Sequence, residues 1–465
     1  MKKVVILGSG IEGLSVAWQI SLLRQFDTAL YEKRDDIGGL CGFYNFDGLK
    51  LDYGPHKIYS VNPELMEVFK DVGGERVVEI KKKQGIILRD RQLDYPIKLR
   101  QLLSIFTFTE IIGMGLSAFV ALSTPPFLKK KISYEDYCQG LFGKKIYNLV
   151  FRPLAEKAWG DPKNLSAYIA RRRIPTKSTW DLISRLLKIK KESRRTNAEV
   201  ILYPKLGFYD ICKAMAEEIE KSGHKIYLGS RPVRLEINNG KIETILFDNS
   251  KEEHPDLVIS TISLTELLPL LYPQEKDADE KENFVKMRHC IIVYLLIDRP
   301  RVIDNHWIFC VDKKLLFSRI SEQKLLSYHG FPEDKTVICC DFSCNGKDPL
   351  WKESDKAIVE KCISGLEGLK IIKKQEIIDY RVVRLPDIYP AYEIGFESKR
   401  ESLFDKINRI ENIISIGRQG MYDYCNVDHC MDMAIYVARS LFSGKEPSSI
   451  NRELIKRTGA YYIVD

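Results

Sequence analysis

The sequence predicts an α/β protein, in which a parallel α/β domain is assembled from separate segments and carries an inserted α+β domain with helices and a mixed or antiparallel sheet. Three observations favour this fold class. A strand–helix–strand pattern occupies residues 3–32, residues 100–200 are mostly helical in pattern, and strand-like alternation returns near residue 225. At 465 residues the chain is too long for one compact core, so we expect two joined domains.

The N-terminal unit has the length and pattern of a βαβ motif. Residues 3–8 are rich in β-branched side chains, as in a short buried strand, and residues 28–32 predict a second, parallel strand. Between them, residues 12–25 place apolar side chains at helical spacing. The whole pattern spans about 30 residues, which is the length expected of this unit.

Segments with strand patterns recur along the rest of the chain. They are residues 225–228, 256–261, 289–297, 335–342 and 413–417. The tripeptide Asn238-Asn239-Gly240 predicts a hairpin turn, and residues 428–443 predict a helix after the last strand. We assign the strands at 289–297 and 335–342 to a second sheet.

The first domain is therefore discontinuous. We expect it to comprise residues 1–70, 200–265 and 405–450, with the helical part of the second domain at 71–199 and its sheet at 266–404. No long internal repeat and no low-complexity linker marks a third domain. The charged stretch 188–195 predicts a solvated helix or a mobile loop.

Composition narrows the class of partner. Lys and Arg total 72 against 64 Asp and Glu, and the net charge of +8 fits an anionic ligand, a membrane surface or a solvated basic surface. We expect no nucleic acid partner. The 11 cysteines show neither a disulfide framework nor zinc-binding pairs, so we expect buried thiols, a cytoplasmic location and no metal site.

One apolar run, residues 103–127, needs a separate interpretation. Its length is marginal for a membrane span, and it contains Glu110 and ends at Pro125-Pro126. We expect it to pack as helix in the second domain or to contact lipid peripherally. The apolar N-terminus does not predict a signal peptide, because Glu12 and the glycines around it interrupt the run.

The first turn of the βαβ unit carries the most informative motif, Gly8-Ser9-Gly10-Ile11-Glu12-Gly13. The first glycine allows a tight turn, the second lets a pyrophosphate approach the backbone, and the third lets helix and strand pack closely. The helix N-terminus offers unpaired N–H groups to phosphates. Glu32 lies 19 residues after Gly13, where an acid binds the ribose hydroxyls. The motif therefore predicts a Rossmann-type dinucleotide site.

The residues after Glu32 resemble one family of such sites. Lys33-Arg34-Asp35-Asp36-Ile37 followed by Gly38-Gly39 resembles the extended fingerprint of flavoproteins related to glutathione reductase, amine oxidases and protoporphyrinogen oxidase. This resemblance implies a glutathione-reductase-like, Rossmann-type FAD-binding domain, with FAD as the cofactor. Further blocks that resemble this fold are residues 203–208, 231–235 and 256–261.

The C-terminal match closes the implied flavin site. Gly417-Arg418-Gln419-Gly420-Met421-Tyr422-Asp423-Tyr424 resembles the segment whose glycines approach the ribityl and diphosphate groups, and the next helix would point its N-terminus at the isoalloxazine edge. The resemblance implies the following FAD-binding residues: Gly8, Gly10, Ile11, Glu12, Gly13, Glu32, Lys33, Gly39, Leu40, Gly54, Pro55, His56, Val233, Thr261, Gly417, Arg418, Tyr424, Asn426, Val427 and Asp428.

Other blocks resemble the UDP-galactopyranose mutase-like branch of this superfamily. Gly54-Pro55-His56 resembles its Gly-x-His loop, which packs along the flavin. Ala158-Trp159-Gly160-Asp161-Pro162 with Leu165-Ser166 resembles its Trp-Gly motif. Residues 93–98, 317–320 and 389–392 resemble further blocks, so the resemblance covers most of the chain.

The branch implies roles on the substrate side. In mutase chemistry, the N5 atom of a reduced flavin attacks the anomeric carbon of a nucleotide-linked sugar. The diphosphate of the sugar nucleotide is the leaving group. Arginines would neutralise that diphosphate and tyrosines would hydrogen-bond it. The implied substrate residues are Arg319, Arg384, Tyr389, Tyr392 and Tyr422, and the implied catalytic residues are His56 and Arg319. Arg171-Arg172-Arg173 is a second basic cluster or a solvated helix face.

Asp423 departs from the mutase pattern, because an acid that pointed into the site would repel a diphosphate. A different sugar nucleotide, or a net oxidation, is therefore equally open. No second Gly-x-Gly-x-x-Gly motif occurs, so any NAD(P)H would bind transiently. We expect a homodimer or a monomer.

Two other interpretations stay open. One is an oxidase or dehydrogenase of the protoporphyrinogen or amine oxidase type with a hydrophobic substrate, which the apolar run 103–127 favours. The other is a binding protein without flavin, of the GDP-dissociation-inhibitor type. The intact Gly38-Gly39 and Gly417-Arg418 segments count against that third interpretation.

Overall fold

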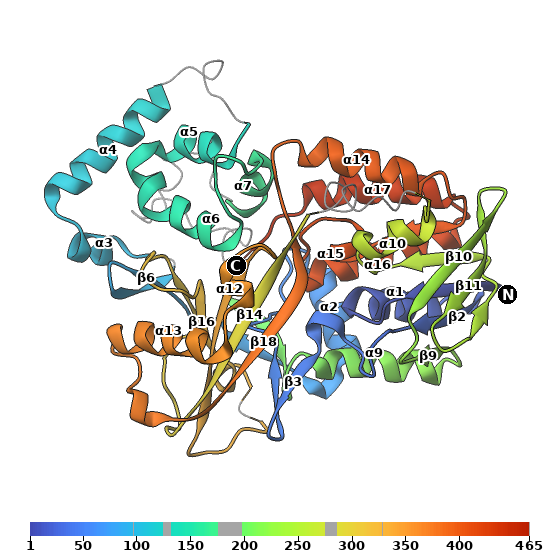
Figure 1. The fold of residues 1–465 in the computed structure, drawn as a ribbon, viewed down its shortest axis with the longest axis horizontal. Helices are drawn as coiled ribbons and strands as arrows, with labels where there is room; N and C mark the ends of the chain where they lie inside the picture. The colour runs from blue at the N-terminus through green and yellow to red at the C-terminus, as the bar shows by residue number, and fades with distance from the viewer. Residues whose placement is uncertain (96, 124–131, 175–197, 275–285, 328, 465) are drawn as a thin grey trace. The chain divides into compact units, whose positions relative to one another are not determined.

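A computed structural model of the chain describes all residues except 96, 124–131, 175–197, 275–285, 328 and 465 (Figure 1). The described residues form two compact units. The first unit comprises Met1–Glu79, Leu202–Lys286 and Glu397–Tyr461, and the second comprises Ile80–Ile201, Met287–Phe396 and Tyr462–Asp465. Each unit therefore combines segments that lie far apart in the sequence.

A five-stranded parallel sheet forms the centre of the first unit. Its order is β19-β13-β1-β2-β9, with β1 at Lys2–Leu7, β2 at Phe26–Tyr31, β9 at Lys225–Tyr227, β13 at Leu257–Ser260 and β19 at Ile413–Ser415. Neighbouring strands are all parallel. Strand β13 is buried throughout, as strands of parallel sheets covered on both faces are. The predicted Rossmann-type α/β fold is confirmed.

Helices pack beside this sheet. Helix α1 (Ile11–Ser21) contacts α9 (Tyr209–Lys221) and α16 (Val427–Phe442), which appear as blue, green and red ribbons in Figure 1. Helix α1 ends at Ser21 rather than at residue 25, and Arg24 in the turn that follows has a positive φ of 52°. The other α-helices among the described residues of this unit are α2 (Pro63–Gly73), α10 (Leu264–Leu271), α14 (Phe396–Ile407), α15 (Gly417–Gly420) and α17 (Pro447–Ala460).

Two hairpins extend the first unit. Strands β10 (Pro232–Asn238) and β11 (Lys241–Phe247) form an antiparallel pair, with β12 (Glu252–Glu253) at its edge. The turn residues Asn239 and Gly240 have φ values of 47° and 77°, as a two-residue hairpin turn requires, so the predicted turn is confirmed. Strands β3 (Phe43–Phe46) and β4 (Leu49–Asp52) form the second hairpin.

Asp52, the last residue of β4, is a buried acid whose protonation affects stability. It accepts hydrogen bonds from the Tyr203 hydroxyl and from the Phe208 amide, the latter at 2.8 Å. Burial raises the pKa of Asp52 to about 7, although both hydrogen bonds oppose the rise. The unfolded value is about 3.9. The protonated acid therefore stabilises the fold below about pH 4, and this contribution is lost as the pH rises to about 7.

We therefore expect Asp52→Asn to flatten the pH dependence of stability in this range. Because the amide stays uncharged, the variant should be more stable than the wild type by about 1–3 kcal/mol above about pH 7. Urea unfolding of both proteins at about pH 5 and about pH 8 measures the difference. If the wild type loses no more stability than the variant between these two pH values, the raised pKa of Asp52 is contradicted.

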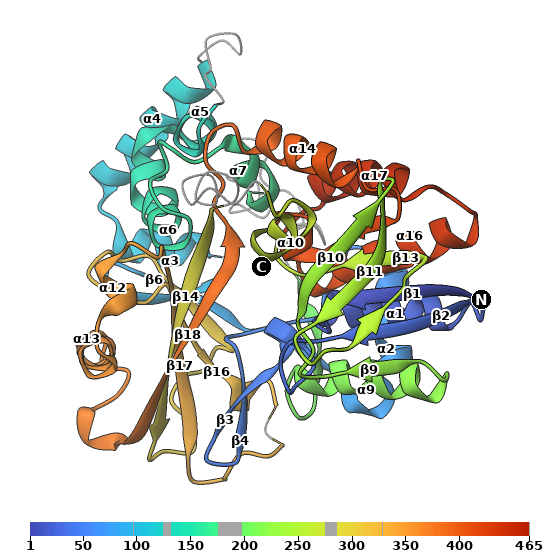
Figure 2. The ribbon, with the colours of Figure 1, turned by 45° about the vertical axis from the view of Figure 1, so that its right-hand side comes forward.

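A mixed seven-stranded sheet forms the core of the second unit. Its order is β18-β14-β17-β16-β15-β6-β7, with β6 at Gln84–Leu88, β7 at Arg91–Tyr95, β14 at Met287–Ile297, β15 at Trp307–Cys310, β16 at Arg319–Glu322, β17 at Thr336–Cys344 and β18 at Ile377–Pro390. The long strands β14, β17 and β18 run antiparallel side by side, as Figure 2 shows, whereas β15 and β6 are parallel. Helix α13 (Asp355–Gly368) packs its apolar side chains into the core of this sheet. The predicted mixed second sheet is confirmed.

Most other described helices of the second unit lie between residues 99 and 173. They are α3 (Leu99–Ile105), α4 (Phe108–Ser123), α5 (Tyr134–Ile146), the π-helical segment Tyr147–Phe151, α6 (Arg152–Ala158) and α7 (Ala167–Arg173). A short helix, α12, spans Pro349–Lys352. Strands β5 (Val77–Lys81) and β8 (Val200–Pro204) contain points where the chain passes from one unit to the other. The charged stretch 188–195 lies outside the described residues.

All 11 cysteines are free and buried, as the sequence predicted. Buried thiols of this kind behave as small apolar side chains. Among the described helices, none combines the length and the apolar content that crossing a bilayer requires.

Candidate functional site

The turn between β1 and α1 is so tight that it needs its glycines. Gly8 has a positive φ of 99° and donates its N–H to the Tyr31 carbonyl at 2.8 Å. A Cβ added to Gly13 would lie 1.9 Å from the Gly8 carbonyl oxygen, and one added to Gly8 would lie 2.5 Å from Thr261 Oγ1. The loop, the start of α1 and the end of β13 therefore meet without room for another side chain.

A second glycine pair lies directly against this turn. Gly10 forms an isolated β-bridge with Gly38, whose N–H donates to the Ser9 carbonyl at 2.8 Å. A Cβ on Gly39 would lie 3.0 Å from the Gly10 Cα. Gly10 is the N-cap of α1 and provides no side-chain cap, so the first-turn N–H groups point outward past bare backbone. Such an arrangement suits a phosphate.

Glu32 follows β2 and lies beside the same turn. One carboxylate oxygen accepts the Ser9 N–H at 2.9 Å and the Ser9 hydroxyl at 3.1 Å, and the other accepts the Arg34 N–H at 3.1 Å. A carboxylate has about four acceptor positions, so Glu32 keeps capacity for ribose hydroxyls. Lys33 next to it pairs with Glu266 at 2.5 Å. The hairpin residue Val233 is half exposed, with 51% of its surface accessible.

The C-terminal glycine segment packs on the same helix. Gly417 has a φ of 88°, and a Cβ there would lie 2.8 Å from Glu12 Cγ. Arg418 donates two hydrogen bonds to the Cys425 carbonyl, at 3.1 and 2.7 Å, and stacks on the Tyr424 ring at 4.4 Å. The structure thus brings the Gly417 segment together with the start of α1, about 400 residues apart in the sequence.

Helix α16 begins beside this segment. Asn426 is its N-cap, and its backbone N–H donates to His429 Nδ1 at 3.1 Å. Asp428 in the first turn is buried, and burial raises its pKa although His429 and Ser60 oppose the rise. The N-terminus of α16 is therefore well ordered by its own side chains.

Glu12 is the unusual member of the fingerprint. Its side chain is buried, and neither carboxyl oxygen has a hydrogen-bond partner among the described residues. Burial raises the pKa of Glu12 well above its usual value, the nearby Cys430 thiol opposes this rise and Asp432 adds to it. A buried polar group without a partner is costly, so the site is suited to a ligand that supplies one.

The residues of this site fit FAD. The bare glycine backbone at the start of α1 suits the diphosphate, and Glu32 suits the adenosine ribose. The unpartnered Glu12 carboxyl, in its uncharged form, is able both to donate and to accept a hydrogen bond. The individual FAD contacts predicted from the sequence stay predictions.

The Gly54-Pro55-His56 loop also belongs to the first unit. Gly54 has a φ of 78°, which favours glycine, and its carbonyl lies 3.0 Å from His56 Nδ1. The partly buried His56 ring lies 5.1 Å from the Phe208 ring. The loop therefore fixes the imidazole through its backbone and through an aromatic contact.

The second unit contains a buried arginine that the sequence analysis did not single out. Arg288, in β14, is 9% exposed and takes part in no ion pair among the described residues. Its Nε donates to the Ala158 carbonyl at 3.1 Å and to Ser343 Oγ at 3.0 Å. Burial lowers the pKa of Arg288, although Cys344 and Asp348 partly offset this effect. A buried cation of this kind is suited to an anionic ligand.

Aromatic side chains gather next to Arg288. A Cβ on Gly160 would lie 3.3 Å from Arg288 Nη1, and the neighbouring Trp159 ring packs edge-on against Tyr389 and Tyr392, at 5.4 and 5.5 Å. Tyr389 is also the register partner of Arg288 across the β14–β18 pair. The structure thus brings together, in one unit, the Trp-Gly motif and the two predicted substrate tyrosines.

Comparison with known protein families identifies the family of the chain. The family of flavin-containing amine oxidoreductases matches residues 13–392 of the chain. The chain belongs to this family. It is an FAD-dependent enzyme of the amine oxidase superfamily, and the interpretation as a binding protein without flavin is wrong.

Individual members of the superfamily are distant in sequence. The 15-cis-phytoene desaturase of Capsicum annuum is 22% identical over 423 residues, which cover 86% of this chain and 67% of the desaturase. A probable UDP-galactopyranose mutase of Klebsiella pneumoniae is 22% identical over 222 residues, 46% of this chain and 53% of the mutase. The crystal structure of a reduced UDP-galactopyranose mutase superposes with a TM-score of 0.81 at 18% identity and covers 100% of this chain and 98% of that one. The similarity to this crystal structure is a similarity of fold.

The two arginines predicted to face the substrate already have partners within the second unit. Arg319 pairs with Asp341 at 2.8 Å. Arg384 pairs with Asp355 at 2.5 Å and also donates to the carbonyls of Trp351 and Glu353. Their roles toward a substrate stay predictions.

In the segment Tyr422-Asp423-Tyr424 of the first unit, the charge of Asp423 is neutralised. Asp423 is fully buried and pairs with Arg400 at 2.5 Å, so its charge is balanced within the protein. The flanking Tyr422 is buried and donates its hydroxyl to the Lys286 carbonyl at 2.9 Å. The expected conflict between Asp423 and a diphosphate therefore loses its physical basis.

Arg288 was missed because it lies one residue before the strand predicted at 289–297. The only local signal was a basic residue at the start of a strongly apolar strand. A cation in that position is more often solvated.

Proposed function

We propose that this flavoenzyme acts on a nucleoside-diphosphate-linked sugar, by a rearrangement like that of a UDP-galactopyranose mutase. The observation that carries the proposal is Arg288, a buried guanidinium without an ion-pair partner among the described residues. It lies beside Trp159-Gly160 and opposite Tyr389 in the second unit. The diphosphate of a sugar nucleotide supplies the missing negative charge.

The surrounding side chains support such a substrate. A guanidinium binds phosphate oxygens through two parallel hydrogen bonds, and tyrosine hydroxyls add further donors. The Trp159 ring offers an apolar face to a base or a sugar. When bound in its reduced form, FAD supplies the electron-rich N5 that a redox-neutral rearrangement needs.

His56 and Arg319 are our proposed catalytic residues. The His56 imidazole is held by the Gly54 carbonyl, and an imidazole is a side chain that suits proton transfer. Arg319 would add positive charge for the departing diphosphate while Asp341 holds its Nε. Any NAD(P)H that reduces the flavin would bind transiently, because the sequence contains no second Gly-x-Gly-x-x-Gly motif.

A second candidate is the oxidation of a hydrophobic substrate. Two observations favour it: the desaturase relative covers 86% of the chain, and α4 exposes a row of apolar side chains. Such a substrate would not need the charge of Arg288.

Turnover under two redox conditions separates the candidates. The FAD-loaded protein is incubated without oxygen with UDP- and dTDP-hexopyranoses, with and without dithionite, and products are separated by chromatography and weighed by mass spectrometry. We expect an isomer of unchanged mass that forms only after reduction. Hydrogen peroxide formed in air from an amine or a porphyrinogen, without any sugar-nucleotide turnover, would favour the second candidate and refute the first.

A further inference from the structure

Helix α4 of the second unit is apolar on two opposite faces. Its 16 residues, Phe108–Ser123, contain a single charged side chain, Glu110. On one face Ile111 and Met114 pack against the core beside β6, and Ala118 is buried. A helix that is apolar all round normally has both faces covered. The other face of α4 is exposed to solvent.

The exposed face forms one continuous row, which we call the α4 stripe. Its members recur every three or four residues, so they lie along one side of the helix. They are Phe108, Ile112, Leu116, Phe119 and Val120, which are 76%, 46%, 62%, 67% and 65% exposed. Leu103 in the preceding helix α3 is 56% exposed. Contiguous apolar surface of this kind marks an interaction site more often than a solvated surface.

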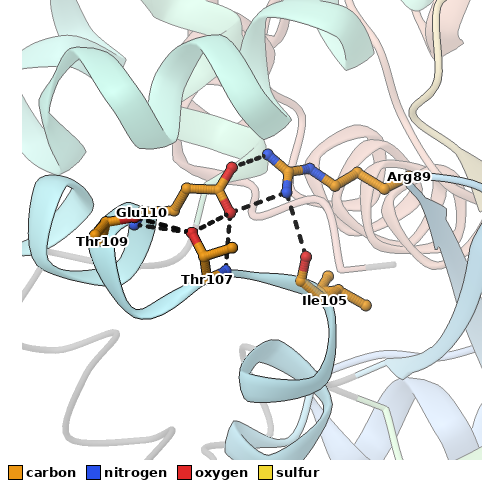
Figure 3. A network of polar contacts seen from close by, with 5 residues as sticks. All are labelled: Arg89, Ile105, Thr107, Thr109 and Glu110. Carbon is orange, nitrogen blue, oxygen red and sulfur yellow. Dashed lines mark hydrogen bonds and ion pairs between the residues drawn. The ribbon is translucent and has the colours of Figure 1, made fainter.

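The stripe is held rigidly at its N-terminal end. Figure 3 shows Glu110 between Arg89, which it pairs with at 2.5 Å, and the N–H and hydroxyl of Thr107. Arg89 also donates to the Ile105 carbonyl, at the end of α3. These contacts lower the pKa of Glu110 to about 2, mainly through the Arg89 hydrogen bond. The single acid of α4 is thus neutralised by a fixed partner.

The middle of α4 is fixed by α5. Gly143 of α5 lies so close to α4 that a Cβ there would be 2.3 Å from the Ser117 carbonyl oxygen. The backbone N–H of Lys145 donates to Ser117 Oγ at 3.2 Å, and its ammonium lies against Gly113. The helix therefore presents its apolar row as part of a packed structure, not as a loose segment.

Basic residues lie against α4 or on and beside the preceding helix α3. Lys145 lies against α4, Arg100 is exposed on α3, and Arg91 reaches α3 by donating to the Ser104 carbonyl at 3.2 Å. None of these three takes part in an ion pair among the residues that the structure describes. An apolar row with a cationic border matches the interface of an anionic bilayer, where acyl chains lie beneath negative headgroups.

We propose that the α3–α4 face of the second unit docks on the surface of a bilayer that contains anionic lipids. Helix α4 is 16 residues long, or about 24 Å at 1.5 Å per residue, which is short of the roughly 30 Å of a hydrocarbon core. It therefore lies in the plane of the interface. In a two-fold dimer through this face the apolar rows would cover each other, but each copy would bring the same cationic side chains and no acidic partners for them. Anionic headgroups supply that negative charge, which favours a lipid surface over a second copy. The inference does not rest on the proposed substrate.

Vesicle flotation of the full-length, FAD-loaded protein tests the proposal. We expect the wild type to float with vesicles of equal parts phosphatidylcholine and phosphatidylglycerol, and to float less with pure phosphatidylcholine or at high salt. The double variant Leu116→Asp with Phe119→Asp should bind at least about tenfold more weakly, because two large apolar anchors become charged. Phe442→Asp, which changes a 59% exposed phenylalanine of the first unit, is the matched control and should float like the wild type.

A second double variant tests the proposal even if the stripe variant does not fold. Arg100→Gln with Lys145→Gln leaves the stripe intact and should weaken binding to the anionic vesicles about fivefold per charge. Flavin absorbance and the unfolding temperature report the fold of every variant. The proposal is overturned if the wild type does not float, if the stripe variant floats equally, or if light scattering without lipid shows a dimer that the stripe variant abolishes.

Discussion

Gly13→Ala is expected to lose FAD. The added Cβ would lie 1.9 Å from the Gly8 carbonyl oxygen and 3.0 Å from the Gly8 carbonyl carbon. Both are backbone atoms, so the loop or the start of α1 must move. The N–H groups of the first turn then no longer converge on the diphosphate. If two hydrogen bonds to a charged group are lost, the FAD affinity falls at least about a hundredfold.

Gly459→Ala is the matched control for this substitution. Gly459 lies in α17 of the same unit, and a Cβ there would meet nothing within 4 Å. We expect this variant to bind FAD like the wild type and to be no less stable, since alanine favours helix over glycine. FAD content after dialysis, and affinity from flavin fluorescence on titration, measure both variants. A Gly13→Ala protein that retains the full FAD content would show that the turn does not hold the cofactor.

Arg288→Ala is expected to abolish tight binding of a nucleoside diphosphate. The guanidinium is buried, and its Nε is already held by the Ala158 carbonyl and by Ser343 Oγ, so its remaining N–H groups have a fixed direction. Removing it leaves the diphosphate without its charge-assisted hydrogen bonds, which lowers the affinity for UDP about a hundredfold. Arg288→Lys keeps the charge but loses the planar arrangement of N–H donors. Its affinity for UDP should therefore lie between those of the wild type and of Arg288→Ala.

Isothermal titration with UDP measures these affinities. Arg301→Ala is the control, because Arg301 pairs with Asp304 on the surface of the same unit and is 47% exposed. The FAD content of each variant should equal that of the wild type, which separates a substrate effect from a cofactor effect. An unchanged UDP affinity in Arg288→Ala would remove this residue from the substrate site.

The cofactor half of the molecule could be predicted from the sequence because its signals are local. The six residues Gly8–Gly13 specify a turn whose geometry needs glycine within a short stretch of chain, and Glu32 follows at a fixed spacing in the same βαβ unit. The burial of Glu12 could not be predicted in this way. It results from Gly417 and Cys430, which lie about 400 residues later in the chain.

The proposed substrate site depends on contacts between distant segments. Arg288 is buried because Ala158 and Ser343 approach it from other parts of the second unit. Asp423 does not repel an anion, because Arg400 of helix α14 neutralises its charge. Neither pairing leaves a periodic pattern, so side-chain type alone predicts a solvated arginine and a repulsive aspartate.

The apolar run at residues 103–127 shows a third limit of prediction from sequence. Its composition predicts helix, and α3 and α4 confirm this over the described residues. Because Ile111 and Phe119 are equally apolar, periodicity does not tell the buried face from the exposed one. Only the packing of α5 against α4 shows that one apolar row is left outside.

Comparing the affinities of the wild-type protein for UDP and for uridine shows whether the chain contains a diphosphate site. The two ligands share the base and the ribose, and differ in the charge that Arg288 would bind. We expect UDP to bind at least about a hundredfold more tightly than uridine, with the difference lost in Arg288→Ala. Equal affinities for UDP and uridine, or no binding of either to the FAD-loaded enzyme, would contradict a sugar-nucleotide substrate.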